Sequence, residues 1–353
     1  MCYNERKLKN MKKKRVAIIF GGKSAEHEVS VKSAKNVLAG LDRDLFIPIL
    51  IGISKKGNWY QLDEVPEEMV SDEGGQLEIT LGSGFFASGL PKPDLLFPVL
   101  HGPFGEDGTF QGLAKMIGIP FVGAGVLGSA LAMDKVVSKK LLQQEGVRVA
   151  DFRAFTKKPD PEEIEDSFSY PVFVKPANLG SSVGVSKAEN REELVTAVEE
   201  AFLYDKKILI EESIFGREVE CSVLGNDNPK ASVLGEVIPV DYYSYDEKYS
   251  NDSQAELKIP AELDPEIEKR VRYIAVRAFK ILNCEGMARA DFFISEGKIY
   301  LNELNTIPGF TDISMYPKLW EVSGLKREDL ITELINLALK RHEEELKLKT
   351  DYR

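Results

Sequence analysis

The sequence predicts an α/β protein of two or three domains that begins with a doubly wound sheet. Its 353 residues suffice for two or three domains. Residues 16–20 form a continuous apolar run, as in a parallel strand buried on both faces, and strands alternate with helices through the first third of the chain. A composition of 43% hydrophobic and 29% charged residues fits a folded soluble protein rather than a disordered one.

The elements that follow are predicted from their apolar patterns. Strands are expected over residues 48–53, 95–100, 171–175, 207–212, 218–224 and 232–239, and helices over residues 30–41, 135–144 and 329–340. Asn190 begins a further helix as its N-cap, with Glu193 three residues on as in a capping box. Asp264 and Pro265 begin another, in the N-cap and N1 positions. Residues 241–258 form a long polar segment, and a loop of that length is more often functional or mobile than inert.

Charge and cysteine content exclude several classes of protein. The net charge of −11 argues against a nucleic-acid-binding surface and gives no reason to expect binding to an anionic membrane. Three scattered cysteines without a CxxC spacing argue against a disulfide framework or a zinc site, and they favour a reducing cytosol. Cys221 and Cys284 stand among apolar residues, so we expect both to pack in a core.

Two segments look like targeting or membrane sequences without meeting the requirements. A basic run over residues 6–15 precedes only five apolar residues, too few for the core of a secretion signal, and residues 1–10 are expected to be a tail without function. Residues 116–133 carry no charge but contain four glycines and a proline. A spanning helix needs about 20 apolar residues, so this segment is better explained as strand, glycine turn and helix start.

A predicted hairpin gathers four polar side chains on one face. Two strands flank a turn at residues 295–297, and side chains alternate between the faces of a strand. Arg289 and Asp291 therefore share a face of the first strand, and Glu303 and Asn305 share a face of the second.

The register of this hairpin decides which side chains meet. If Ile294 pairs with Lys298, Asp291 lies opposite Leu301 and the arginine lies opposite the glutamate. The carboxylate and amide oxygens of this face are hard ligands suited to magnesium. The alternative is an exposed polar face with an Arg–Glu pair across it, which contributes little to stability.

A second candidate site is a glycine- and serine-rich loop at the end of an apolar strand. Lys175 ends the strand, and Gly180, Ser181, Ser182 and Gly184 follow. Lysine supplies a point charge for phosphate, glycines let backbone N–H groups approach phosphate oxygens, and serines add donors. The segment is not a Walker A sequence, and an ordinary flexible turn is the alternative.

Two further loops follow predicted strands at the sheet edge where open α/β sheets bind ligands. Residues 21–30 place two glycines and Glu26 directly after the first strand. Glu26 could hold a substrate ammonium group, or it could merely favour the N-terminus of the next helix. His101 follows the strand over residues 95–100 and is a candidate site residue.

Gly123, Gly125 and Gly128 match the Gly-x-Gly-x-x-Gly pattern of dinucleotide-binding proteins. The pattern follows a short strand and precedes a helix, so a dinucleotide-binding oxidoreductase stays an alternative. The fingerprint also needs an acid about 20 residues later at a strand end. Glu145 has nearly that spacing but lies at a helix end, and we favour a domain hinge.

Together these segments resemble the D-alanine–D-alanine ligases of the ATP-grasp superfamily. The matching segments are GGKSAEHEVS, HGPFGEDGT, MDK at 133–135, VKPANLGSSVGVSK, ILIEESIFGREVE, YDEKY at 245–249, ARADFF and LNELNTIPGFTDISMYP. They occur in family order over almost the whole chain. The resemblance implies a Rossmann-like N-terminal domain over residues 1–125, a small ATP-grasp domain over 126–212, and a catalytic ATP-grasp domain over 213–353 with a mobile loop at 241–258.

The resemblance also implies roles for the matching residues. Catalysis would use Glu26, Ser181, Tyr249, Arg289 and Gly309. Substrate would contact Glu26, His101, Ser314 and Met315. Nucleotide would contact Lys135, Lys175, Ser181, Ser182, Glu211, Glu212, Ser213, Ile214, Glu218 and Lys248. Two Mg²⁺ ions, which Mn²⁺ can replace, would be held by Asp291, Glu303 and Asn305.

The reaction implied by the resemblance has two steps. The carboxylate of one D-alanine attacks the γ-phosphate of ATP, and the amine of a second D-alanine then attacks the resulting acylphosphate. Arg289 and the N–H of Gly309 would stabilise the oxyanion. Tyr249 would join Glu26 and Ser181 in tying the mobile loop shut, which excludes water.

The resemblance leaves the second substrate open between D-alanine, D-serine and D-lactate. Tyr249 and Met315 favour the dipeptide, because relatives that make D-alanyl-D-lactate or use D-serine carry other residues there. We further expect a homodimer in the cytoplasm that acts in peptidoglycan synthesis, with no nucleic-acid or membrane partner.

Overall fold

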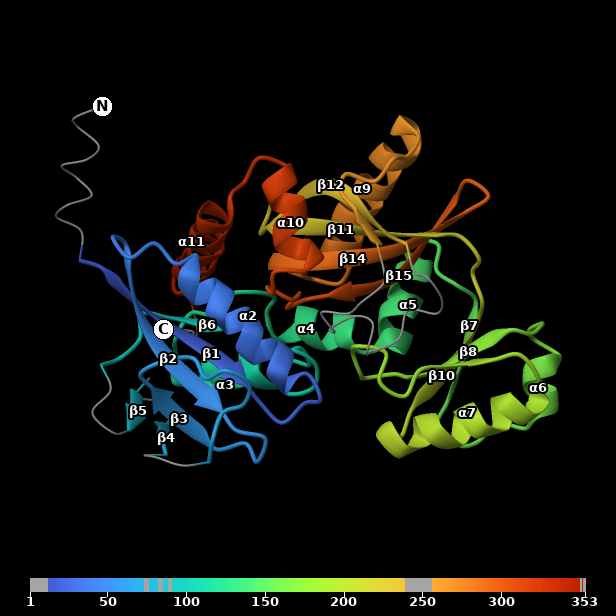
Figure 1. The fold of residues 1–353 in the computed structure, drawn as a ribbon, viewed down its shortest axis with the longest axis horizontal. Coiled ribbons are helices and arrows are strands. Elements are labelled where there is room, and N and C mark those ends of the chain that lie inside the picture. Colours follow the sequence, from blue (N-terminus) through green and yellow to red (C-terminus); the bar gives the residue numbers. More distant parts are fainter. Residues whose placement is uncertain are drawn as a thin grey trace.

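The computed structural model describes residues 12–72, 76–81, 85–87, 91–238, 256–349 and 351. Most of the predicted loop at 241–258 lies outside the described residues. Three main sheets follow one another along the chain, with helices packed between and around them (Figure 1). Within the described part of the chain, no helix is both long enough and apolar enough to cross a membrane.

The first sheet has the strand order β3-β2-β1-β6. Its strands are β1 (Lys14–Gly21), β2 (Phe46–Ile53), β3 (Trp59–Leu62) and β6 (Leu95–Pro98). β1 pairs in parallel with β2 and β6, as the apolar run over residues 16–20 predicts, and β3 is antiparallel. A small antiparallel hairpin, β4 (Glu78–Thr80) with β5 (Phe85–Ala87), stands beside it.

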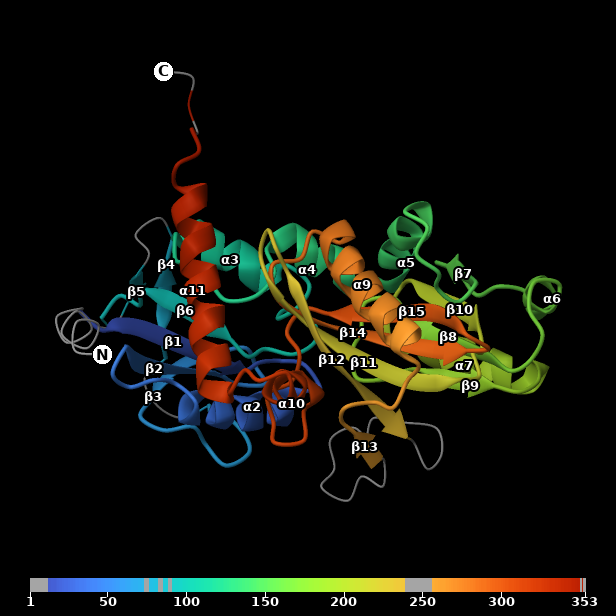
Figure 2. The same ribbon diagram turned by 90° about the horizontal axis from the view of Figure 1, so that it is seen from above.

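Helices cover both faces of β1. Val16, Ile18 and Phe20 share a core with α2 (His27–Ala39) and with the closing helix α11 (Arg327–Glu345). Ala17 and Ile19 point the other way, into a core with α3 (Thr109–Ile117). The doubly wound prediction is confirmed, and Figure 2 shows α11, from the far end of the chain, lying along this sheet.

The second sheet is antiparallel, with the order β7-β10-β8-β9. Its strands are β7 (Phe152–Phe155), β8 (Val172–Pro176), β9 (Ser186–Ala188) and β10 (Ile208–Glu212), and it packs on α6 (Pro161–Glu165) and α7 (Arg191–Tyr204). α7 begins as predicted, because the Asn190 side chain accepts a hydrogen bond from the N–H of Glu193 at 3.0 Å.

The third sheet is also antiparallel, with the order β13-β12-β11-β14-β15. Its strands are β11 (Arg217–Gly225), β12 (Lys230–Ile238), β13 (Glu256–Lys258), β14 (Gly286–Ser295) and β15 (Lys298–Asn305). The neighbouring helices are α4 (Val126–Met133), α5 (Lys135–Gln144), α9 (Pro265–Ile281) and α10 (Met315–Val322). The buried Cys221 and Cys284 belong to the core that this sheet forms with α9, as predicted.

The predicted register of the β14–β15 hairpin is wrong. Ser295, not Ile294, pairs with Lys298, because the turn contains only two residues, both at positive φ. A bulge further along adds Asn302 to β15, so Asp291 pairs with Glu303 rather than with Leu301. The arginine at 289 then pairs with the asparagine at 305. All four polar residues still share one face.

The glycine pattern at residues 123–128 serves close packing. A Cβ on Gly128 would lie 2.4 Å from the carbonyl oxygen of Asn283, and a Cβ on Gly286 would lie 3.2 Å from Gly123. The carbonyl of Gly123 accepts a hydrogen bond from the buried Arg341 at 2.6 Å. Gly123 and Gly128 therefore lie close against residues 283–286, and the oxidoreductase hypothesis gains no support from the fold.

We expect Gly128→Ala to lower the free energy of unfolding by about 1–3 kcal/mol, because the new methyl group collides with the Asn283 carbonyl. Gly112→Ala is the matched control: Gly112 also lies within a helix, and its added methyl would meet nothing within 4 Å. It should raise stability by about 0.5–1 kcal/mol. Urea denaturation measures both. Equal shifts in the two variants would contradict the packing role.

Candidate functional site

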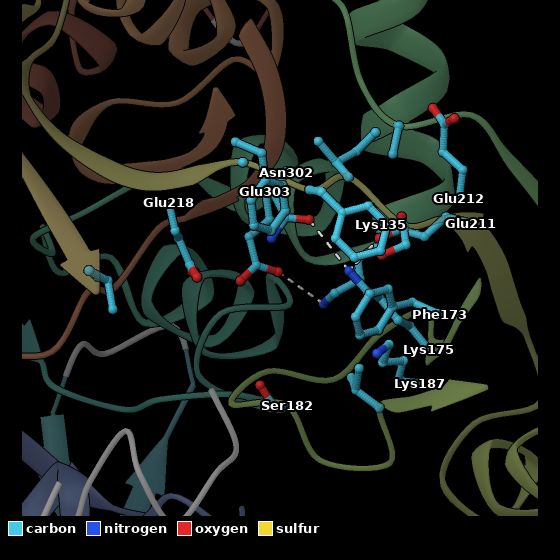
Figure 3. Close-up of a pocket in the computed structure, with 18 of the residues that line it drawn as sticks. Lys135, Phe173, Lys175, Ser182, Lys187, Glu211, Glu212, Glu218, Asn302 and Glu303 are labelled. Atoms are coloured by element: carbon cyan, nitrogen blue, oxygen red, sulfur yellow. Dashed lines mark hydrogen bonds and ion pairs between the residues drawn. The ribbon is translucent and has the colours of Figure 1, made fainter. Parts of the chain in front are cut away.

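A cavity of about 520 Å³ lies between the second and third sheets. Lys135 at the start of α5, Lys175 on β8 and Glu303 on β15 converge on it, as Figure 3 shows. Lys135 Nζ lies 3.4 Å from Glu303 Oε2, and Lys175 Nζ lies 3.4 Å from Asn302 Oδ1. Ammonium groups therefore face oxygen-bearing side chains of the third sheet across the cavity.

A buried ion-pair cluster forms one wall of the cavity. Glu211 Oε1 lies 2.5 Å from Lys175 Nζ, and Glu211 Oε2 lies 2.9 Å from Lys139 Nζ. Burial alone would raise the pKa of this carboxyl group, but the two lysines outweigh burial and lower the pKa of Glu211 to about 2. Glu211 is therefore ionised at neutral pH.

The loop after β8 reaches the first sheet. Ser181 and Ser182 have φ angles of 52° and 60°, in the left-handed region that residues other than glycine seldom adopt. Ser181 Oγ donates a hydrogen bond to Glu26, which is buried at the N-terminus of α2. A Cβ on Gly180 would lie 3.2 Å from Glu26 Oε2, so glycine permits this close approach.

The polar face of the third sheet is a network of charges. Arg289 donates to both carboxylate oxygens of Asp291, at 2.7 and 2.6 Å, and its Nε lies 2.8 Å from Glu220 Oε2 on β11. Asn305 Nδ2 donates to Asp291 Oδ2 at 3.0 Å. Asp291 also pairs across the strands with Glu303. The guanidinium group is thus held between two carboxylates.

Residues of the first sheet's edge hold the segment that follows β15. Glu106 Oε1 accepts the N–H of Ile307 at 2.8 Å, and His101 Nδ1 donates to the carbonyl of Ile307 at 2.9 Å. Ser33 Oγ accepts the N–H of Phe310 at 3.1 Å and lies 3.2 Å from His101 Nε2. Both peptide groups of Ile307 are therefore fixed from outside the third sheet.

Burial shifts the pKa values of His101 and Glu106. Burial lowers the pKa of His101, so the imidazole is neutral at neutral pH, and its bond to a carbonyl places the proton on Nδ1. Burial and the nearby Glu26 raise the pKa of Glu106 to about 8, although its two backbone hydrogen bonds oppose this shift.

Gly309 and Ser314 lie together in the next turn. A Cβ on Gly309 would lie 2.7 Å from Ser314 Oγ, and this hydroxyl accepts the N–H of Thr311 at 2.9 Å. Met315, the first residue of α10, is buried against Leu319 and Gly235. The turn thus places the Ser314 hydroxyl close to Gly309, two residues after Ile307.

The structure places most of the predicted nucleotide-binding residues around the cavity. Those that line it are Lys135, Lys175, Ser181, Ser182, Glu211, Glu212, Ser213, Ile214 and Glu218. Lys248 and Tyr249 lie outside the described residues. The roles assigned to these residues stay predictions.

The sequence analysis missed several residues that contact the predicted ones. Glu220 could have been found, because Glu218, Glu220 and Ser222 alternate with apolar residues along β11 and so share one face. Glu106 and Ser33 carried no such signal, since Ile307 and Phe310, whose N–H groups they accept, stand more than 200 residues away in the sequence.

A doubly wound domain followed by two antiparallel sheets that enclose a lysine-lined cavity defines an enzyme of the ATP-grasp class. Two family models match the chain: "D-ala D-ala ligase N-terminus" over residues 15–124 and "D-ala D-ala ligase C-terminus" over residues 141–336. The chain belongs to the D-alanine–D-alanine ligase family.

Individual relatives agree with this assignment. The D-alanine–D-alanine ligase of Shouchella clausii is 49% identical over 96% of this chain and 98% of its own length. The solved ligase from Coxiella burnetii superposes with a TM-score of 0.85 at 36% identity, covering 96% of this chain and 97% of that one.

Two further similar structures are described with a different second substrate or with bound ATP. VanG D-Ala:D-Ser ligase from Enterococcus faecalis has a TM-score of 0.82 at 37% identity, covering 93% of this chain and all of that one. The Bacillus anthracis D-alanine–D-alanine ligase, solved as a complex with ATP, has a TM-score of 0.74 at 27% identity, covering 94% and 99%.

We expect Ser33→Ala to lower the free energy of unfolding by about 1–3 kcal/mol, because it leaves the buried N–H of Phe310 without its acceptor. Ser167→Ala is the control: the Ser167 hydroxyl is also hydrogen-bonded, but it is exposed, so water can replace its partners. Urea denaturation compares the two. A Ser33 variant as stable as the Ser167 variant would show that this bond contributes nothing.

Proposed function

We propose that this chain uses ATP to join two molecules of D-alanine into D-alanyl-D-alanine for peptidoglycan synthesis, releasing ADP and phosphate. The observation that carries the proposal is the cavity in which Lys135 and Lys175 face the polar side chains of β15. Membership of the ligase family and the ATP complex of a relative support it.

The nucleotide would occupy the cavity between the two antiparallel sheets. Lys135 and Lys175 supply positive charge for phosphate oxygens, and the loop at Ser181 and Ser182 supplies further donors. Adenine and ribose would lie along residues 211–214, where β10 ends.

The donor set of the polar face fits magnesium. Asp291, Glu303 and Asn305 offer oxygen atoms from one face of two adjacent strands. Mg²⁺ in phosphate-transferring sites is typically held by one or two carboxylates together with the phosphates, and this set has two carboxylates and an amide. Bound there, the metal would offset negative charge on the transferring phosphoryl group.

The first D-alanine would lie between the first sheet and the cavity. The buried Glu26 carboxylate would bind its ammonium group, with Ser181 holding that carboxylate in place. The substrate carboxylate then points toward the γ-phosphate. Its oxygen attacks the phosphorus, the bond to the β-phosphate oxygen breaks, and an acylphosphate and ADP result.

The second D-alanine would bind near Ser314 and Met315. Its amine attacks the acyl carbon, and phosphate leaves. Arg289 and the N–H of Gly309 would stabilise the oxyanion, which requires donors that are fixed beforehand. Glu220 and Asp291 fix the guanidinium group.

The positions of Gly309 and its neighbours depend on the N-terminal domain. Glu106 and His101 hold the Ile307 peptide groups two residues before Gly309. They act in this proposal as positioning residues for the oxyanion donor.

Closure of the loop at 241–258, with Lys248 near the phosphate and Tyr249 bonded to the Glu26–Ser181 pair, is the part of the proposal that rests on sequence resemblance alone. An acylphosphate exposed to water would be hydrolysed, so the reaction needs such a cover. Use of Mg²⁺ or Mn²⁺, a homodimeric state and a cytoplasmic location are proposed on the same basis.

We expect Arg289→Ala to retain ATP binding but to lower kcat for ligation by about 10²–10³-fold, because one oxyanion donor is lost. Isothermal titration measures binding, and a phosphate-release assay measures turnover. Arg270→Ala, which alters an exposed arginine on α9, should behave as wild type. Near-normal turnover of the Arg289 variant would exclude the role.

The substrate assignment is tested by a panel with ATP and Mg²⁺, read by phosphate release and mass spectrometry. It contains D-alanine, L-alanine, and D-alanine mixed with D-serine or D-lactate. We expect D-alanyl-D-alanine to dominate in every mixture and L-alanine to give no product. Dominance of a mixed product would instead assign the chain to the chemistry named for the VanG relative or to a D-lactate ligase.

A further inference from the structure

Lys139 is a fully buried lysine that the reaction does not use. It lies one helical turn after Lys135 on α5, and its side chain is 2% exposed. Its Nζ lies 2.9 Å from Glu211 Oε2 and 5.9 Å from the centre of the Phe152 ring. Burying a charged lysine is costly unless it is paired, so this residue calls for an explanation.

Glu211 forms an ion pair with each of the two lysines, and these lysines differ in position. Lys175 lines the cavity and is 12% exposed, whereas Lys139 lies behind the cavity wall. The Glu211 side chain itself is 4% exposed, so solvent offers its carboxylate little compensation. Each lysine forms an ion pair with a different oxygen of this carboxylate.

Nucleotide binding changes this balance. A phosphate group in the cavity competes with Glu211 for the ammonium group of Lys175. If Lys175 were the sole counter-charge, its departure would leave a buried carboxylate unpaired, which is strongly destabilising. A second lysine that cannot reach the cavity removes this penalty.

We propose that Lys139 is a positioning residue that serves as the permanent counter-ion of Glu211 and thereby frees Lys175 to bind nucleotide phosphate. The inference rests on the proposed function, because it requires ATP in this cavity. The two lysines of the cluster then have different roles. Lys139 keeps Glu211 ionised and in place at the adenine side, and Lys175 leaves Glu211 to bind nucleotide phosphate.

The test is a double-mutant cycle on nucleotide affinity. Lys139→Met is made in wild type and in Glu211→Gln, and dissociation constants are measured by isothermal titration for ATP with Mg²⁺ and for adenosine. Lys140→Met is the matched control, since Lys140 is the adjacent, exposed lysine on α5. Thermal melting checks that each variant is folded.

In wild type, Lys139→Met should weaken ATP binding by about tenfold or more. Without Lys139, the Glu211 carboxylate has no counter-charge once Lys175 binds phosphate. Adenosine binding should change by less than about twofold, since no phosphate competes for Lys175. In the Glu211→Gln background the same substitution should change ATP affinity by less than about twofold, because no carboxylate needs compensation.

Three outcomes overturn the inference: unchanged ATP affinity in Lys139→Met, an equal loss for ATP and adenosine, or an equal loss of ATP affinity in both backgrounds. The last two would assign Lys139 to packing of the adenine side. If Lys139→Met alone does not fold, the double variant Lys139→Met with Glu211→Gln still tests the inference. Its ATP affinity must equal that of the single variant Glu211→Gln. Failure of wild type to bind ATP would instead refute the proposed function.

Discussion

The site depends on the polar face of the third sheet, where two carboxylates must lie next to each other. Asp291 and Glu303 stand opposite each other on neighbouring strands, and like charges in that position destabilise a sheet unless other groups compensate. Arg289 compensates Asp291 from the same strand, and Lys135 reaches Glu303 from a helix earlier in the chain. Of these two positive groups, Lys135 also lines the cavity where phosphate charge would arrive, whereas Arg289 lies between the carboxylates of Asp291 and Glu220.

Local pattern predicted much of this arrangement. Alternation along β14 and β15 predicted that Arg289, Asp291 and Asn305 share one face. This prediction holds despite the error in register, because the bulge in β15 returns its polar side chains to that face. The error in register has a physical origin. The same residues are compatible with a two-residue turn and with a three-residue turn, and only the backbone φ angles at Glu296 and Gly297 distinguish the two turns.

The contacts that complete the site were not predictable from local pattern. The sequence Ser-Lys-Lys at 138–140 does not reveal that Lys139 is buried and Lys140 exposed, since this depends on how α5 is rotated against β10. Glu106 and Ser33 bind backbone groups of a segment far along the chain, and periodicity contains no information about such partners. What the sequence misses here is how the elements pack against one another, within a domain at Lys139 and between domains at Glu106 and Ser33.

The packing of α11 on the first sheet has a consequence for how the protein is made. Leu330, Leu334 and Ile335 complete the core that Val16 and Ile18 begin. A ribosome delivers domains from the N-terminus, and each generally folds as a unit once its own residues have emerged. Here β1 shares its core with α11, so the core of the opening domain stays incomplete, with apolar surface exposed, until residues 327–345 have been synthesised.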